Sequence, residues 1–273
     1  MSDWPDLNMY SSDIMLTTDF YTEGPVIGKQ GEIYVTNILG GQILRIDDRY
    51  TMDEWAVCKS PNGQFMSTGG DHFVCNTLDG TIEHYDSKGN FVKTWFKGKL
   101  DDHLVKATND LWVKSDGSIF FTDSVRINGA IGYITPQGEA QLIKNGLDYP
   151  NGIVYDTLRN FLYVAESYQN RILKVDVSRT GAPVEVLVDL PIHPSRRMVD
   201  NLPDGLAMDG NSHLLIAHYG MGLLHRYDLA SRTLRSFHTQ IPLTSNVAIG
   251  DGCIVITGGM QEPGPGKIRI LKR

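Results

Sequence analysis

Six short openings recur along this chain, and each begins with a small polar or acidic residue that carries a side-chain oxygen. These residues are Glu23, Asn62, Asn109, Asn151, Asp204 and Asn246. Two carboxylates and up to four amides at equivalent positions suit a divalent cation such as Ca²⁺, Mg²⁺, Mn²⁺ or Zn²⁺. Carboxylates that face each other in a channel repel unless a cation or a proton intervenes. The openings therefore predict a cation site, provided that the fold brings them together.

The spacing of the openings indicates which elements position them. Successive openings are 39, 47, 42, 53 and 42 residues apart, and two short β-rich runs follow each one. A period of this length built from several short strands is typical of a propeller blade. The sequence predicts one all-β domain over residues 1–273, a six-bladed β-propeller. Its blades start near residues 23, 62, 109, 151, 204 and 246, after a lead-in over residues 1–12.

Two segments have particular expected roles in this ring. The last blade is one strand short, and residues 13–18 are the spare strand-like segment, so we expect this N-terminal strand to close the propeller. The longest gap between openings contains a proline-rich insertion over residues 190–200, just ahead of Asp204. A lid or a pocket wall is the expected role of this insertion.

Charge and composition exclude several classes of protein. The formal net charge is −7 and no large Lys/Arg cluster is present, which excludes a nucleic-acid partner. The N-terminus lacks the features of a signal peptide, and no run is long enough to span a membrane, so we expect a cytoplasmic protein. The three cysteines, Cys58, Cys75 and Cys253, are expected to be buried thiols.

Other polar residues end the β-rich runs that follow the third, fourth and fifth openings. Asp123, Glu166 and His218 occupy these places and are expected to rise to the same rim as the openings, where they would contact a substrate. The pattern GxSxG is absent, which excludes a serine hydrolase of the nucleophile-elbow type. Taken one at a time, the Asn-Gly and Asp-Gly pairs of the openings are also ordinary turn sequences.

Four motifs give the chain a resemblance to a known family. They are Thr22-Glu23-Gly24-Pro25, Thr108-Asn109-Asp110-Leu111, Tyr149-Pro150-Asn151-Gly152-Ile153 and Leu202-Pro203-Asp204-Gly205-Leu206. The chain resembles, from about residue 20 to its end, the gluconolactonase/regucalcin (senescence marker protein) family of six-bladed propellers, which includes bacterial lactonases. The resemblance implies that Glu23, Asn151 and Asp204 bind one divalent metal, with calcium first and zinc, manganese or magnesium as alternatives. It also implies that Asn109 lies at the metal or the substrate.

The resemblance implies a metal-dependent lactonase that acts on a sugar lactone or a related small cyclic ester. A cation polarises the ester carbonyl, Asp204 is the expected base for the attacking water, and Asn109 is expected to hold the developing oxyanion. The expected partner is a small-molecule lactone, and the expected state is a monomer or a weak homo-oligomer. The alternatives are a phosphotriesterase-like hydrolase and a non-catalytic propeller that binds calcium or a protein.

Overall fold

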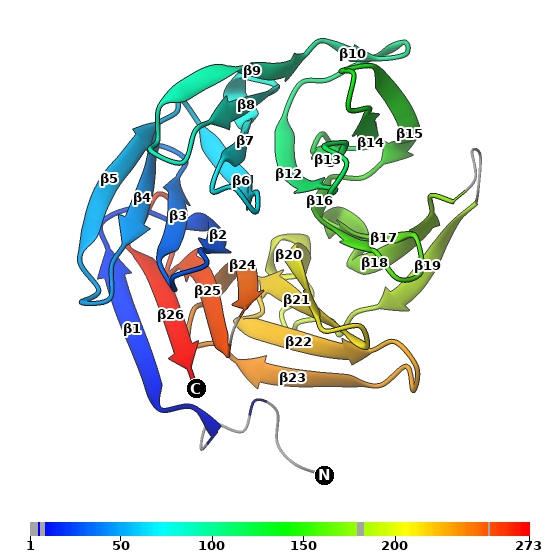
Figure 1. Ribbon diagram of the computed structural model, residues 1–273. Helices are drawn as coiled ribbons and strands as arrows, with labels where there is room; N and C mark the ends of the chain where they lie inside the picture. The colour runs from blue at the N-terminus through cyan, green and yellow to red at the C-terminus, as the bar shows by residue number, and fades with distance from the viewer. Residues whose placement is uncertain (1–4, 6–8, 179–182, 251) are drawn as a thin grey trace.

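The protein folds into β-sheets arranged around a centre (Figure 1). The computed structural model describes Pro5 and residues 9–178, 183–250 and 252–273, so most of the predicted lead-in lies outside the described residues. The described part of the chain contains no α-helix, and its 3₁₀ segments include η2 (Thr77–Asp79), η3 (Ser167–Gln169) and η4 (Met198–Asp200). None of the helical segments described is long and apolar enough to cross a membrane. The all-β, propeller-like fold is confirmed.

Four separate sheets each contain four antiparallel strands. The first is β2 (Glu23–Ile27), β3 (Ile33–Asn37), β4 (Gln42–Ile46) and β5 (Met52–Val57), and the second is β6 (Pro61–Met66), β7 (His72–Asn76), β8 (Thr81–Tyr85) and β9 (Phe91–Lys97). The third is β12 (Thr108–Val113), β13 (Ile119–Asp123), β14 (Gly129–Ile134) and β15 (Ala140–Leu147), and the fourth is β16 (Pro150–Asp156), β17 (Phe161–Glu166), β18 (Arg171–Asp176) and β19 (Val184–Asp189). A small hairpin of β10 (Lys99–Leu100) and β11 (His103–Leu104) precedes the third sheet.

The remaining strands form one eight-stranded sheet, where the sequence predicted two separate blades. Its members are β20 (Leu202–Asp209), β21 (His213–Tyr219), β22 (Leu223–Asp228), β23 (Leu234–His238), β24 (Leu243–Gly250), β25 (Cys253–Gly259), β26 (Gly266–Lys272) and β1 (Ser12–Thr18). The sheet consists of two four-stranded runs joined at one residue pair, Tyr219 with Leu243. The runs join because β21 continues far enough to pair once with the start of β24.

Buried side chains fill the spaces between adjacent sheets. Along β17, Leu162 and Val164 pack in the cluster shared with the third sheet, whereas Tyr163 and Ala165 pack in the cluster shared with β20 and β21. All four side chains are at most 2% exposed. A strand covered on both faces needs apolar residues at successive positions rather than at alternate ones, which explains the continuous apolar run in its sequence. The three cysteines are buried free thiols, as predicted.

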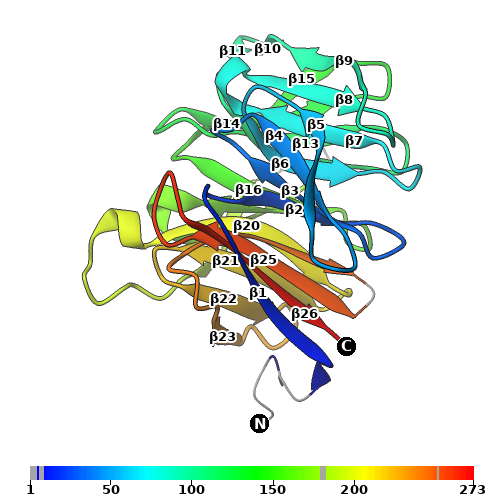
Figure 2. The ribbon, with the colours of Figure 1, turned by 90° about the vertical axis from the view of Figure 1, so that its left-hand side faces the viewer.

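The N-terminal strand closes the structure. Figure 2 shows β1 alongside β26, and the two strands pair antiparallel from Ser12 with Lys272 to Thr18 with Gly266. The buried guanidinium of Arg269 on β26 pairs with Asp13 on β1, at 2.9 Å from Nε to Oδ1 and 2.7 Å from Nη2 to Oδ2. The predicted pairing of the two ends of the chain is confirmed.

Deleting residues 1–18 should destabilise the whole protein. The deletion removes β1, and with it the contacts of Ile14, Met15 and Leu16 with two core clusters. These contacts contribute about 3 kcal/mol of apolar burial. At 2–4 °C per kcal/mol, the melting temperature measured by circular dichroism should fall by roughly 6–12 °C. Deletion of residues 1–9, which keeps β1 and the Tyr10 ring that packs against the core, is the control and should lower the melting temperature far less. Equal melting curves for the two deletions would contradict closure by β1.

Candidate metal centre

The six openings form the inner strands of the structure, not turns ahead of the first strand. Figure 1 shows β2, β6, β12, β16, β20 and β24 closest to the centre, and each contacts the next, with β24 contacting β2. Their composition, rich in Gly, Pro and Asn, is poor for a strand, which is why the sequence did not predict them as strands. The predicted β-rich runs are the second and third strands of each sheet.

Every inner strand has a register shift at its opening. The shifts lie between Glu23 and Val26, Pro61 and Gln64, Thr108 and Leu111, Pro150 and Ile153, Pro203 and Leu206, and Thr244 and Asn246. A bulge inserts an extra residue on one strand and redirects the side chains beside it. The repeated bulge therefore gives equivalent opening residues equivalent positions around the centre.

The glycines after the opening residues permit close approach between neighbouring inner strands. A Cβ atom on Gly152 would lie 2.2 Å from the carbonyl oxygen of Asp204 on the next strand. A Cβ atom on Gly205 would lie 1.9 Å from Oδ1 of Asn246 on the strand after that. Only glycine fits at such contacts. The glycines are thus required by packing, and not only by the turns that their sequence resembles.

The four predicted metal ligands line one cavity of about 320 Å³. Glu23, Asn109, Asn151 and Asp204 are all buried, and Asn62 joins them in the wall of this cavity. Asn246 differs, because its Nδ2 donates to Oε2 of Glu23 at 3.0 Å and its side chain helps to line a separate cavity of about 220 Å³. The structure therefore brings the predicted ligands together. Whether a cation binds them is a proposal, taken up below.

The electrostatics of this cavity favour a positive charge. Burial raises the pKa of Asp204 well above its usual range, and the nearby carboxylates of Glu23 and Asp110 raise it further. Burial also raises the pKa of Glu23, although hydrogen bonds from the backbone N–H of Gly24 and from Asn246 oppose the shift. Within the described part of the chain, no basic side chain forms an ion pair with Glu23 or Asp204. Two buried carboxylates without a countercharge are costly to keep ionised.

A buried oxygen without a partner completes the donor set. Among the described residues, Oδ1 of Asn151 is buried and accepts no hydrogen bond. Asn151 lines the same cavity as the two carboxylates, and an amide oxygen is a suitable ligand for a hard cation. No group of three His, Cys, Asp or Glu residues in the described chain is arranged as a metal cluster, so a cation here would rely on amide oxygens as well as carboxylates. The donor set fits one divalent cation with open positions.

The sequence did not predict the aromatic and acidic wall of the cavity. Tyr21, Tyr149, Tyr219 and Glu262 line it, and Oη of Tyr219 donates to Oε1 of Glu262 at 2.9 Å. Burial raises the pKa of Tyr149 to about 12, so its hydroxyl stays protonated and can donate a hydrogen bond. Tyr21, Tyr149 and Glu262 lie in connections between strands, and Tyr219 ends β21. None of them is an opening residue, and only the folded structure shows that they line the cavity.

The three predicted substrate contacts do not line the cavity. Asp123 accepts hydrogen bonds from the backbone N–H groups of Lys106 and Ala107 and lies 2.8 Å from Nε2 of His103. Glu166 pairs with Arg171 at 2.7 Å.

The third residue, His218, is fully buried, and its Nδ1 lies 2.9 Å from Nε2 of His225. Contact of these three residues with a substrate stays a prediction, although none of them lines this cavity. The last side chain of a second strand is committed to neighbouring strands and loops.

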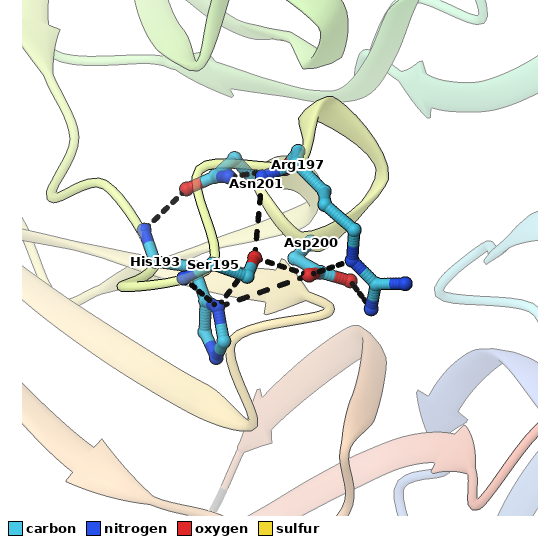
Figure 3. Close-up of polar contacts among 5 residues, drawn as sticks. All are labelled: His193, Ser195, Arg197, Asp200 and Asn201. Atoms are coloured by element: carbon cyan, nitrogen blue, oxygen red, sulfur yellow. Dashed lines mark hydrogen bonds and ion pairs between the residues drawn. The ribbon is translucent and has the colours of Figure 1, made fainter.

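The insertion over residues 190–200 contributes to the cavity wall through Val199. Figure 3 shows that Asp200 holds this loop together by accepting hydrogen bonds from Ser195 and from Nε and Nη2 of Arg197, the latter at 2.8 and 2.9 Å. The Arg197 guanidinium and the Ser195 hydroxyl lower the pKa of Asp200. His193 completes the residue types of a hydrolytic triad, but Ser195 lies between the histidine and the carboxylate and does not line the cavity. This order is wrong for a triad, in which the histidine takes the central place.

Comparison with known proteins identifies the family. The family model described as "SMP-30/Gluconolactonase/LRE-like region" matches residues 21–253, which include all six opening residues. The chain belongs to this family. The resemblance inferred from the motifs is confirmed.

Relatives of the chain carry the word lactonase in their names. Lactonase drp35 of Staphylococcus haemolyticus is 22% identical over 216 residues, which cover 73% of this chain. The match spans 64% of the length of that relative. Among solved structures, a gluconolactonase from Xanthomonas campestris superposes with a TM-score of 0.79 at 21% identity, covering 98% of this chain and 93% of the other. A calcium-binding protein, regucalcin, from Agrobacterium tumefaciens gives a TM-score of 0.75 at 17% identity over 93% of this chain and 90% of the other. At these identities the structures support the shared fold.

The packing of this family member at the bulges can be tested with Gly152→Ala. The added methyl would meet the backbone of the next inner strand, which cannot move without disturbing the ring, so we expect a loss of about 1–3 kcal/mol in the free energy of unfolding. Gly69→Ala is the matched control, because the nearest heavy atom to its Cβ would be 3.6 Å away. Urea denaturation should show a clearly lower midpoint for Gly152→Ala and a change within about 0.5 kcal/mol for Gly69→Ala. Equal effects would mean that the bulges do not pack as described.

Proposed function

We propose that this protein is a divalent-cation-dependent lactonase that hydrolyses a sugar lactone or a related small cyclic ester. The observation that carries the proposal is the pair of buried carboxylates, Glu23 and Asp204, in one cavity with the unpartnered amide oxygen of Asn151. The family assignment and the names of the relatives support a reaction on cyclic esters. Calcium is the first candidate cation, since the regucalcin neighbour is described as calcium-binding. We also propose that the two halves of the eight-stranded sheet act as separate blades of a six-bladed propeller.

The cavity residues have distinct roles in this proposal. Glu23, Asn109, Asn151 and Asp204 would hold the cation. When bound, the cation supplies polarisation of the ester carbonyl and a lowered pKa for the attacking water. Asp204 accepts the proton of that water with its second carboxylate oxygen. The side-chain N–H of Asn109 donates to the oxygen that gains negative charge.

The size and the wall of the cavity suit a small polar ring. A volume of about 320 Å³ lies at the lower end of the range for small-molecule sites. The hydroxyl of Tyr149 can donate to a substrate hydroxyl, whereas the apolar side chains of Ile38, Val199 and Leu202 exclude water from the other walls. A partly apolar wall strengthens the electrostatic interactions inside the cavity.

The reaction class can be tested with a panel of lactones assayed by acid release. We expect hydrolysis that EDTA abolishes and that one divalent metal restores. A parallel assay with phosphotriesters separates the lactonase from a phosphotriesterase. Cation binding without turnover of any substrate would instead support a non-catalytic calcium-binding protein.

Glu23→Gln and Asp204→Asn should each remove most of the bound metal and leave the fold intact. Each substitution keeps the shape of the side chain but removes a negative charge that the cation needs. Elemental analysis of the purified proteins measures the metal content, and circular dichroism checks the fold. Glu166→Gln is the control, because Glu166 is a buried carboxylate outside the cavity, and this variant should retain its metal. Wild-type metal content in both cavity variants would remove the proposed site.

Asn109→Ala should separate catalysis from metal binding. Loss of one donor to the oxyanion should lower kcat/KM by roughly 100-fold. Most of the metal should stay bound, because both carboxylates and Asn151 remain as ligands. Asp204→Ala should remove both activity and most of the metal. Near-wild-type turnover by Asp204→Ala would show that the assigned base is wrong.

A further inference from the structure

The backbone on both sides of Gly24 holds the Glu23 carboxylate in place. The N–H of Gly24 donates to Oε2 of Glu23 at 2.7 Å, and its carbonyl accepts a hydrogen bond from Nε2 of Gln64, also at 2.7 Å. Gly24 has a φ of +46°, and a Cβ atom there would lie 2.3 Å from the carbonyl oxygen of Asn62. The N–H belongs to the Glu23–Gly24 peptide and the carbonyl to the Gly24–Pro25 peptide, so the φ and ψ of Gly24 couple the hydrogen bond from Gln64 to the one that the Glu23 carboxylate accepts.

Gln64 is in turn held by a buried histidine. Nδ1 of His72 lies 2.8 Å from Oε1 of Gln64. Because the amide nitrogen of Gln64 faces the Gly24 carbonyl, its oxygen must face His72, and Nδ1 of His72 must carry the proton. Burial lowers the pKa of His72 to about 3, so the ring is neutral and its Nε2 carries no proton.

His72 lowers the stability of the core in which it is buried. Its side chain is fully buried between Trp55 and Tyr34, with ring centroids 4.3 and 4.6 Å away. Among the described residues, Nε2 of His72 has no hydrogen-bond partner. An unpartnered buried nitrogen costs about 1–3 kcal/mol, whereas a phenylalanine would fill much the same space without that cost. A costly group in an otherwise aromatic cluster indicates a role other than packing.

We infer that His72 and Gln64 are positioning residues that orient Glu23 for cation binding through the carbonyl of Gly24. The inference rests on the proposed function, since it assigns a task within the same cation site. Neither residue touches the cavity that would hold the cation. The chain of hydrogen bonds runs from the interface between the first two sheets to the bulge of β2. It restricts the rotation of the two peptide groups that flank Gly24, at the register shift between Glu23 and Val26.

The test measures cation affinity in chelator-treated, full-length protein by calorimetric titration with calcium chloride and with manganese chloride. The variants are His72→Phe, Gln64→Met and the double variant. Each single substitution should weaken binding by about tenfold or more, as the loss of outer-shell partners typically does. If His72 acts through Gln64, the double variant should bind no more weakly than Gln64→Met alone. The melting temperature of metal-free His72→Phe should equal or exceed that of the wild type.

His225→Phe is the matched control, since His225 is also a fully buried histidine whose pKa burial lowers, to about 4. It should destabilise the fold without weakening cation binding. Two results would overturn the positioning role of His72 and Gln64. One is wild-type cation affinity in His72→Phe or in Gln64→Met, and the other is a double variant whose loss of affinity equals the sum of the two single losses. If the wild-type protein binds neither cation, both the proposed function and the positioning role are wrong. If every variant binds the cation as tightly as the wild type, only the positioning role is wrong.

Discussion

The cavity depends on hydroxyl groups that bridge one sheet to the bulged inner strand of the next. Thr36 donates to the carbonyl of Asn62 at 2.9 Å, Thr122 to that of Asn151 at 2.8 Å, and Ser167 to that of Pro203 at 2.7 Å. A bulge removes backbone groups from the strand ladder, and a buried carbonyl without a partner is costly. These hydroxyls satisfy the bulge carbonyls and at the same time tie adjacent sheets together. The opening side chains therefore project from a backbone that is fixed on both sides.

The same arrangement explains which polar side chains reach the centre. Residues at a bulge project from a backbone that has left the regular alternation of a strand, so Asn109 and Asn151 can face the cavity. Residues at the end of a second strand, such as Asp123, remain in the regular pleat between two neighbouring sheets. A polar group there must find partners inside the packing, and Asp123 finds them in two backbone N–H groups and a histidine. Position relative to the bulge, more than residue type, separates cavity residues from structural ones.

Much of the fold could be predicted from the sequence because its repeats constrain it strongly. The period of the openings gave the all-β ring, and the spare strand at the N-terminus gave the pairing of β1 with β26. The inner strands could not be recognised, because their glycines, prolines and asparagines serve close packing and bulges rather than strand propensity. The pairing of Tyr219 with Leu243 depends on the length of a single strand, which no local pattern fixes. Glu262 reaches the cavity from a loop outside the repeat, so its place depends on the folded ring.

The two carboxylates are placed asymmetrically around the ring, although the six openings repeat regularly along the sequence. The inner strands that carry Glu23 and Asp204 are not neighbours, because β24 lies between them. From that strand Asn246 donates to Glu23, and its Oδ1 packs against the backbone at Gly205, next to Asp204. A neutral amide thus separates the two carboxylates on the side where the strands are closest, and it stabilises one of them. Carboxylates on adjacent strands would repel at the shortest possible distance, and a single bound cation would have to offset that repulsion before it gained any affinity. Placing an amide between them leaves both carboxylates in the wall of the cavity, where, within the described chain, Oδ1 of Asn151 also has no hydrogen-bond partner.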